Sequence, residues 1–242
     1  MDARTDRPTE PARANPEPRQ RWRLTFARAA SSENAPGSGR DYVAAWERAL
    51  EGSGLPIVTT DASRPKLMLA VPLPTGASGR AELLDFWLTE RVAAWRVREC
   101  LAGNVPHGHE VSALEDVWLG SPALSGRVAA ADYRVSVRCG ASRDGLANAA
   151  STLLAAAALP RERAKGGGTK TYDLRPLLID LSVDDHAGAA LTLRIRTRIH
   201  PELGSGRPDE VVAALSESLG HSIEVLEIVR ERLTLADELP LD

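Results

Sequence analysis

Hydrophobic and polar positions alternate along some stretches of the chain and recur at helical spacing along others. Trp22, Leu24 and Phe26 alternate with arginine and threonine, which is the period of a half-buried strand. Residues 41–54 place apolar side chains on one face of a helix, and Gly52 and Gly54 end it. These two patterns predict a β-strand followed by an α-helix at the start of the ordered chain.

The succession of strand, helix, two strands, helix and strand is predicted twice, over residues 21–124 and again over residues 128–235. This order is the split βαββαβ motif, so we predict an α+β fold of two tandem ferredoxin-like units with antiparallel sheets. Residues 1–20 contain no Leu, Ile, Val, Phe or Trp, and we predict a disordered tail there. In each unit both helices cover one sheet face, so function is expected on the face that stays open.

Composition narrows the functional classes only coarsely. The 242 residues are 43% hydrophobic and 26% charged, with a net charge of -3, which argues against a strongly basic nucleic-acid coat protein. No apolar run is long enough to span a membrane, and the polar, Pro-rich start does not resemble a secretory signal. Cys100 and Cys139 alone build neither a disulfide framework nor a metal site. We expect a cytoplasmic protein with no cofactor.

The clearest local signal is the stretch LTLRIRTRIH, residues 191–200. Arg194, Arg196 and Arg198 point to one side of the predicted strand, about 7 Å apart by the strand rise. In the predicted fold the neighbouring strand adds Arg134 and Arg138 to the same open face. Like charges on paired strands repel, so five clustered arginines need anionic partners.

Three kinds of partner could neutralise this face. The chain's own Asp173, Asp180, Glu224 and Glu227 lie on flanking strands; RNA or another polyanion is a second partner, and an acidic protein is a third. The stretch RERAKGGGTKTYDLR, residues 161–175, adds cations beside three glycines, either as an anion-binding loop or as a plain hairpin connection. The predicted RNA- or anion-binding residues are Arg134, Arg138, Arg194, Arg196, Arg198, Lys165, Lys170 and Arg175.

Signals for catalysis are weak. No nucleophile, kinase, dinucleotide or zinc motif is present, and His107 and His109 lie in a short turn that Gly108 explains more simply than a metal would. The five tryptophans mostly fit core positions. If the chain is an enzyme, an RNA-processing or RNA-modifying one, its general acid/base candidates are Asp41, Lys66 and His200.

Several stretches together resemble the radical-SAM-linked protein family, a bacterial domain of unknown function, over about residues 20–235. In the first half these are Ser38 with Asp41, WERALEGSGLP (46–56), RPKLMLAVPLPTG (64–76) and ELLDFWL (82–88). In the second half they are RERAKGGGTKTYDLRPLL (161–178) and SGRPDEVVAAL (205–215). Gly39, Ala62 and Arg64 stand where the family pattern has His, Asn and His, so the first-half motifs are less complete.

The resemblance implies a radical SAM protein as partner and an association with RNA metabolism. Combined with the arginine face, it favours a non-catalytic accessory protein that binds RNA, or an RNA-acting radical SAM protein, through its second half. A purely structural scaffold for that partner is a third hypothesis.

Overall fold

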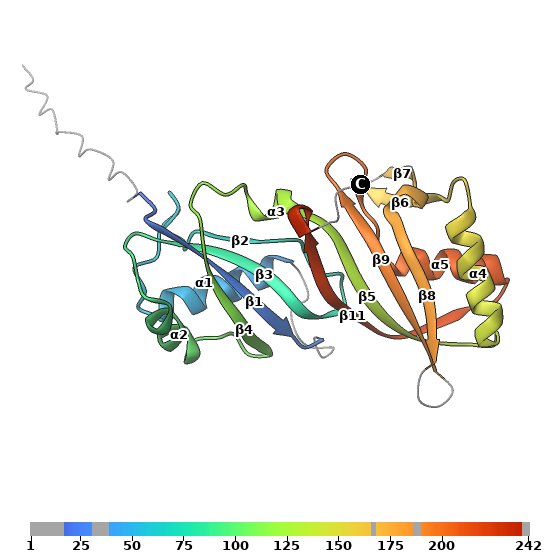
Figure 1. Ribbon diagram of the computed structural model, residues 1–242, viewed down its shortest axis with the longest axis horizontal. Coiled ribbons are helices and arrows are strands. Elements are labelled where there is room, and N and C mark those ends of the chain that lie inside the picture. The colour runs from blue at the N-terminus through green and yellow to red at the C-terminus, as the bar shows by residue number, and fades with distance from the viewer. Residues whose placement is uncertain (1–16, 31–38, 166–167, 186–189, 239–242) are drawn as a thin grey trace, which may run out of the picture.

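The computed structural model is an elongated molecule with two lobes side by side along its long axis (Figure 1). The structure describes residues 17–30, 39–165, 168–185 and 190–238. Most of the predicted tail lies outside these ranges. Gln20, however, already begins the first strand and is 5% exposed, so regular structure starts one residue before the expected boundary.

The first half is a four-stranded layer covered by two helices. Its elements are β1 (Gln20–Arg28), α1 (Gly39–Gly52), β2 (Leu67–Leu69), β3 (Ser78–Leu88), α2 (Ala94–Ala102) and β4 (His109–Val117). The strands lie in the order β4-β1-β3-β2, antiparallel throughout. The predicted alternation in β1 holds, because Trp22, Leu24 and Phe26 enter one core with Trp46 of α1 and Leu101 of α2. Both helices therefore pack on the same sheet face.

The second half repeats this succession with a hairpin inserted. Its elements are β5 (Val128–Cys139), α4 (Arg143–Ala155), β6 (Pro160–Lys165), β7 (Gly168–Asp173), β8 (Leu178–Asp185), β9 (Leu191–His200), β10 (Gly204–Ser205), α5 (Pro208–Leu219) and β11 (Ile223–Leu235). The strand order is β8-β9-β5-β11, again antiparallel. Val135 and Ile195 of the sheet share a core with Leu146 of α4 and Leu215 of α5. Short helical turns occupy Leu124–Arg127 (α3), Arg175–Leu177 (η1) and Ala236–Glu238 (η2).

Local sequence explains where these helices begin and end. The Ser142 side chain accepts a hydrogen bond from the Gly145 N–H and so caps α4. Pro208 occupies the first turn of α5, where its missing N–H costs nothing. Gly220 ends α5 in the left-handed conformation, at φ 65°, which glycine adopts without strain.

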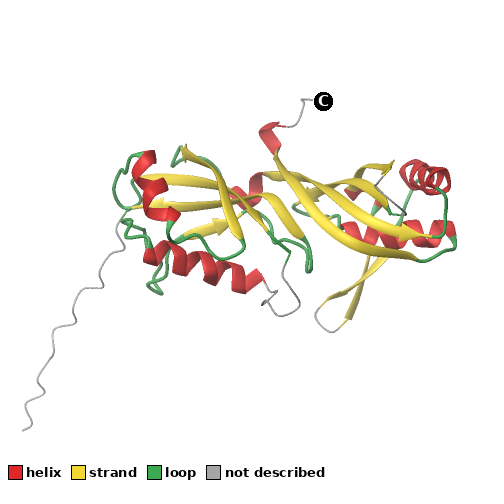
Figure 2. Ribbon diagram, turned by 90° about the horizontal axis from the view of Figure 1, so that it is seen from below, coloured by secondary structure: helices red, strands yellow, loops and turns green. Residues whose placement is uncertain are grey.

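A single sheet crosses both halves, which the sequence did not predict. Val229 and Arg230 of β11 pair in parallel with Ser78 and Gly79 of β3, giving the continuous order β10-β9-β5-β11-β3-β1-β4. The α+β class with antiparallel pairing is confirmed, but this junction makes the sheet mixed. Figure 2 shows the continuous run of strands between the two lobes.

A buried ion pair fastens the junction. Arg230, 1% exposed, donates from Nε to Glu82 Oε1 at 2.9 Å and also binds Glu82 Oε2. Its Nη atoms donate to the carbonyls of Pro72, at 3.2 Å, and Val71, at 2.9 Å. A side chain at Gly79 would collide with the Glu82 side chain and displace it from this pair. Each nitrogen of the guanidinium therefore donates a hydrogen bond within the junction.

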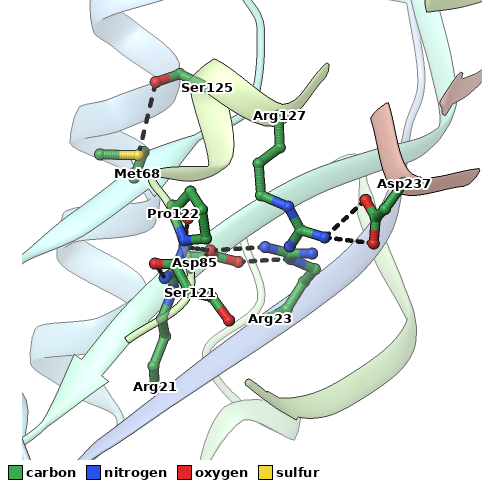
Figure 3. Close-up of polar contacts among 9 residues, drawn as sticks. All are labelled: Arg21, Arg23, Met68, Asp85, Ser121, Pro122, Ser125, Arg127 and Asp237. Atoms are coloured by element: carbon green, nitrogen blue, oxygen red, sulfur yellow. Dashed lines mark hydrogen bonds and ion pairs between the residues drawn. The ribbon is translucent and has the colours of Figure 1, made fainter. Parts of the chain in front are cut away.

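The open face of the first-half sheet is covered by the connection between the halves (Figure 3). Arg21 and Arg23 both donate to the Asp85 carboxylate, and all three side chains are almost fully buried. Arg21 also donates to the carbonyls of Ser121, at 2.7 Å, and Pro122, at 3.1 Å. The expectation of an open face on each unit therefore fails for the first half.

Two details bear on the sequence analysis. Residues 160–165 and 168–173 pair as the β6-β7 hairpin, in agreement with the hairpin connection that was one of the two interpretations of this stretch, and η1, which contains Pro176, separates β7 from β8. Trp95 and Trp118 are exceptions to the expected core positions of the tryptophans. Trp95 is 67% exposed because Val97 and Leu101 define the inward face of α2, and a residue two positions before Val97 points away from it. Trp118, 77% exposed, lies just beyond the end of β4.

Candidate functional site: the open strand face and the cleft behind it

The predicted arginine face lies on the uncovered side of the second-half sheet. β5 and β9 are neighbours, and Arg134 is in register with Arg194. The even-numbered arginines of β9 and the arginines of β5 point away from the core, whereas Tyr133, Val135 and Ile195 point into it. The sequence therefore placed these side chains on the correct face.

Four of the five strand arginines have carboxylate partners. Arg134 reaches Glu231 at 2.8 Å and Glu227 at 3.2 Å. The three further pairs are Arg138–Glu224 at 2.8 Å, Arg194–Asp184 at 2.8 Å and Arg196–Asp132 at 3.5 Å. The hydrogen bond to Glu231 is the main reason that the pKa of Arg134 is raised. Of the three kinds of partner considered for this face, the chain's own carboxylates therefore neutralise most of it.

We call these ion-paired residues on the uncovered sheet face, which form two pairs and two larger groups, the charge ladder. It crosses five strands, β3, β11, β5, β9 and β8, and alternates arginines with carboxylates. Its members are Arg80, Glu231, Arg134, Glu227, Arg138, Glu224, Arg232, Asp132, Arg196, Arg194 and Asp184. Six cations face five anions, so the surface is almost neutral overall yet strongly patterned.

Two of the four carboxylates that the sequence suggested as partners for the arginines do pair with them. Glu224 and Glu227 do pair with the arginines. Asp173 instead accepts the backbone N–H groups of Leu159, at 2.7 Å, and Arg175, at 2.9 Å. Asp180, although in register with Arg196, has no ion pair among the described residues. Glu231, Asp132 and Asp184 complete the ladder in their place, as the preceding distances show.

Of the four other predicted cations, the structure describes the side chains of Arg198 and Arg175. Arg198 is exposed and has no ion pair within the described part of the chain. Arg175 donates to the Leu178 carbonyl at 2.8 Å, and Leu178 is in register with Thr197, so Arg175 and Arg198 lie near the same strand ends. The side chains of Lys165 and Lys170 lie outside the described residues. Anion binding by these four stays a prediction.

The acid/base candidates are engaged separately. Lys66 lies over the Trp87 ring, with its Nζ 5.0 Å from the ring centroid. His200 Nδ1 accepts the N–H groups of Glu202 and Leu203. The Asp41 side chain lies outside the described residues. Within the described residues, no contact joins Lys66 and His200 into a reaction centre.

The histidine turn is partly buried in an aromatic cluster. His109 Nδ1 lies 3.1 Å from the His107 carbonyl oxygen, and its ring centroid is 5.6 Å from those of Phe26 and Trp46. Burial, together with the nearby Arg28 charge, lowers the pKa of His109. Within the described ranges, no three His, Cys, Asp or Glu side chains are grouped to hold a metal ion.

A cleft of about 630 Å³ lies between the two halves, on the helix-bearing side of the sheet. Its walls come from the 71–75 segment of the first half and from β5, β6, β9, β10, β11 and the start of α5 in the second half. The lining residues are Val71, Pro72, Leu73, Pro74, Thr75, Tyr133, Arg163, Ile199, Ser205, Gly206, Arg207, Asp209 and Ile228. Stretches 64–76, 161–178 and 205–215, quoted above for the family resemblance, therefore meet here. Sequence reasoning did not foresee this, because the meeting depends on the β11-β3 junction.

Arg163 is held rigidly at the cleft wall. Its Nε and Nη2 donate to the two oxygens of Glu210, at 2.9 and 2.8 Å, and its guanidinium lies 4.8 Å from the Tyr172 ring centroid. Burial and the neighbouring Glu210 raise the pKa of Tyr172 to about 12. Arg207, by contrast, is exposed and has no ion pair among the residues the structure describes. The cleft thus combines one neutralised and one unneutralised guanidinium.

The comparison with known families decides the assignment of the chain. The family described as "Uncharacterized protein conserved in bacteria (DUF2344)" matches residues 21–207. The chain belongs to this family. The match covers all of residues 21–124 and continues through the second half as far as Arg207 at the cleft. No curated protein matches the chain.

Solved structures show weaker likenesses. One from "Crystal Structure of a Cbf5-Nop10-Gar1 Complex" is 11% identical and has a TM-score of 0.47 over 86% of this chain and 48% of that chain. One from "Crystal Structure of an Unknown Protein from Galdieria sulphuraria" is 18% identical, with a TM-score of 0.27 over 85% and 96%. The chain thus spans about half the length of the first of these. At TM-scores below 0.5, neither likeness establishes a function.

The described helices contain none that is long and apolar enough to cross a membrane.

Proposed function

We propose that this chain is a non-catalytic accessory protein that docks on a partner protein through the charge ladder. The observation that carries the proposal is the exposed alternation of arginines and carboxylates across five strands. Arg138 and Arg194, with side chains 57% and 54% exposed, stand at its surface together with Glu224 and Asp184. A partner with the complementary pattern could pair with both signs of charge at once.

The same alternation makes a nucleic acid a poorer fit. A phosphate backbone would gain contacts to the arginines but would be repelled by the five ladder carboxylates. Affinity for nucleic acid depends on uncompensated cations that replace counterions, and the ladder has nearly none to offer. It also lacks an exposed aromatic pair on which bases could stack.

Within this proposal, each half is a ferredoxin-like unit, with the boundary between 124 and 128. The strand orders β4-β1-β3-β2 and β8-β9-β5-β11, each with two helices on one face, support this assignment. The short helix α3 occupies the expected boundary. The second-half sheet then has one face without helices, and a partner could dock on that face.

The resemblance to the radical-SAM-linked family makes a radical SAM protein that acts on RNA the first partner to test. The experiment measures the affinity of such a protein, taken from the same bacterium, for the purified full chain by surface plasmon resonance. The ladder double variant Arg138→Glu/Arg194→Glu should weaken binding at least tenfold. The matched control is Arg96→Glu, which reverses an exposed arginine on α2 outside the ladder. Equal affinity of the ladder variant and the wild type would contradict docking through this face.

RNA binding is the second candidate, and Arg198 favours it as the exposed strand arginine that lacks an ion pair in the described ranges. Binding of cellular RNA is measured at 50 and 200 mM salt for the wild type and for Arg194→Ala/Arg196→Ala/Arg198→Ala. A steep loss of affinity with salt and with the triple substitution would support RNA and displace protein docking. Indifference to both changes would remove RNA as a ligand of this face.

A further inference from the structure

The cleft and the charge ladder lie on opposite faces of the same strands. Tyr133 lines the cleft, and Arg134, the next residue of β5, belongs to the ladder. On β11, Ile228 lines the cleft, whereas Glu227 belongs to the ladder. A ligand in the cleft would therefore not compete with a partner on the ladder, and the two sites can be tested separately.

The cleft is a preformed structure because both walls are tied down. Arg230 holds the Val71 and Pro72 carbonyls while it pairs with Glu82, which fixes the 71–75 segment against the second half. On the opposite wall, a side chain at Gly206 would collide with the Leu177 carbonyl oxygen and with Thr197. The chain at Gly206 is therefore packed tightly against its support, and little reorganisation is needed for a ligand to enter.

Polar and apolar groups share the lining about equally. Val71, Leu73, Ile199 and Ile228 contribute aliphatic side chains, and none of the four is fully buried. About 300–1,000 Å³ is usual for clefts that take small organic ligands, and these are commonly apolar with a few polar groups at domain junctions. These four side chains offer a contact surface for the apolar part of a ligand, beside the polar groups that would bind its charged end.

The charged side chains in the lining indicate which polar group a ligand would carry. The positive groups are Arg163 and Arg207, and the negative group is Asp209. Glu210 balances Arg163 but leaves its Nη1 without an assigned acceptor among the described residues. Arg207 is then the charge that a ligand can neutralise, and a guanidinium matches carboxylate and phosphate oxygens in geometry. Asp209 limits the site to one compact anionic group and repels a polyanion.

We infer that the cleft binds a small organic anion, with its phosphate or carboxylate on Arg207 and its apolar body between Leu73 and Ile228. This inference is independent of the proposed docking on the ladder. It commits to an anion-headed amphipathic molecule of mononucleotide size. Phosphate esters and aromatic carboxylates share this chemistry and are separated by the choice of probe.

The test is isothermal titration calorimetry of the full chain with AMP, N-acetyltryptophan, adenosine and inorganic phosphate. Binding of AMP or N-acetyltryptophan is expected, and it identifies the preferred head group. Adenosine, which lacks the anion, should bind at least tenfold more weakly than AMP if AMP is the ligand. Inorganic phosphate, which lacks the apolar body, should likewise bind at least tenfold more weakly.

Two variants locate the site. Arg207→Ala should reduce the affinity at least tenfold, with partial recovery in Arg207→Lys. Leu73→Trp should fill the cleft and abolish binding, while Arg96→Ala, on α2, should bind as the wild type does. Melting temperatures close to that of the wild type confirm that the variants are folded.

Three outcomes overturn the inference: no binding of either organic anion at millimolar concentration, affinity unchanged in both Arg207→Ala and Leu73→Trp, or phosphate binding as tightly as AMP. The ladder variant Arg138→Glu/Arg194→Glu should bind the anion normally. Failure of the cleft is thus distinguishable from failure of the docking proposal.

Discussion

The two halves carry arginines on the same face of similarly ordered strands, yet the two faces end in opposite states. In the first half the connection between the halves seals Arg21, Arg23 and Asp85 from water. In the second half the charge ladder stays at the surface. Arg21 and Arg23 share one carboxylate in the interior, whereas Arg194 and Asp184 pair in water. Coverage by another segment, rather than residue type, decides whether such an ion pair is structural.

The largest loss of stability is expected when the buried ion pairs of the first half are disrupted. Asp85→Asn leaves two buried guanidiniums without a counter-charge, so the free energy of unfolding should fall by about 3–5 kcal/mol. Urea denaturation monitored by circular dichroism measures this value. The matched variant Asp184→Asn removes an exposed ladder carboxylate and should cost less than about 1 kcal/mol. Equal losses in the two variants would show that burial does not separate the faces.

A smaller loss is expected from overpacking in the second half. Gly206→Ala forces a methyl group against the Leu177 carbonyl and Thr197, and should lower the free energy of unfolding by about 1–3 kcal/mol. Gly126→Ala is the control, because a side chain there meets no atom within 4 Å. The same denaturation experiment compares them. If Gly206→Ala is no more destabilising than the control, the cleft wall at Gly206 is not tightly packed.

A smaller effect on stability is expected at low pH, and it should come from His109 in the first half. Folding lowers the pKa of His109 below its ordinary 6.5, so the unfolded chain binds this proton more readily. The contribution of neutral His109 is complete above pH 6.5 and is lost as the pH falls through and below that value. Thermal melting between pH 5 and 8 should show a slope that is reduced in His109→Asn. The control His221→Asn, at an exposed second-half site, should keep the wild-type slope; loss of slope in both would assign it elsewhere.

The smallest change in stability is expected when a single ion pair of the charge ladder is removed. Arg194→Ala should change the free energy of unfolding by less than about 1 kcal/mol, and the change should shrink in 1 M salt because the pair is solvated. Denaturation at low and high salt measures it. A salt-independent loss above 2 kcal/mol would mean that the ladder is a structural element.

The sequence predicted the order of strands and helices because alternation and helical spacing record which side chains face a core. It placed Arg134 and Arg194 on one face for the same reason. It could not distinguish Arg21 from Arg194, since both alternate with apolar residues and only the path of residues 118–127 separates them. Glu231 joined the ladder through a register shift in β11, between Arg230 and Arg232, which periodicity does not reveal.

The cleft could not be predicted from the sequence, for a different reason. Its walls come from segments around Leu73, Arg163 and Arg207, and each reads as an ordinary loop or helix start. Their meeting depends on the parallel pairing of two strands that lie far apart in the chain. Pattern analysis of one sequence contains no measure of such distant pairing.

The β11-β3 junction has a consequence for how the molecule is made. Glu82 and Arg230 are 148 residues apart, so the first half leaves the ribosome long before the strand that completes its sheet edge. Ring closure over that length is entropically costly and comes late in folding. Until then Glu82 lacks its ion pair with Arg230, and the edge of β3 at Ser78 and Gly79 is open to pairing. A nascent chain stalled before residue 223 should therefore be especially prone to association with other copies.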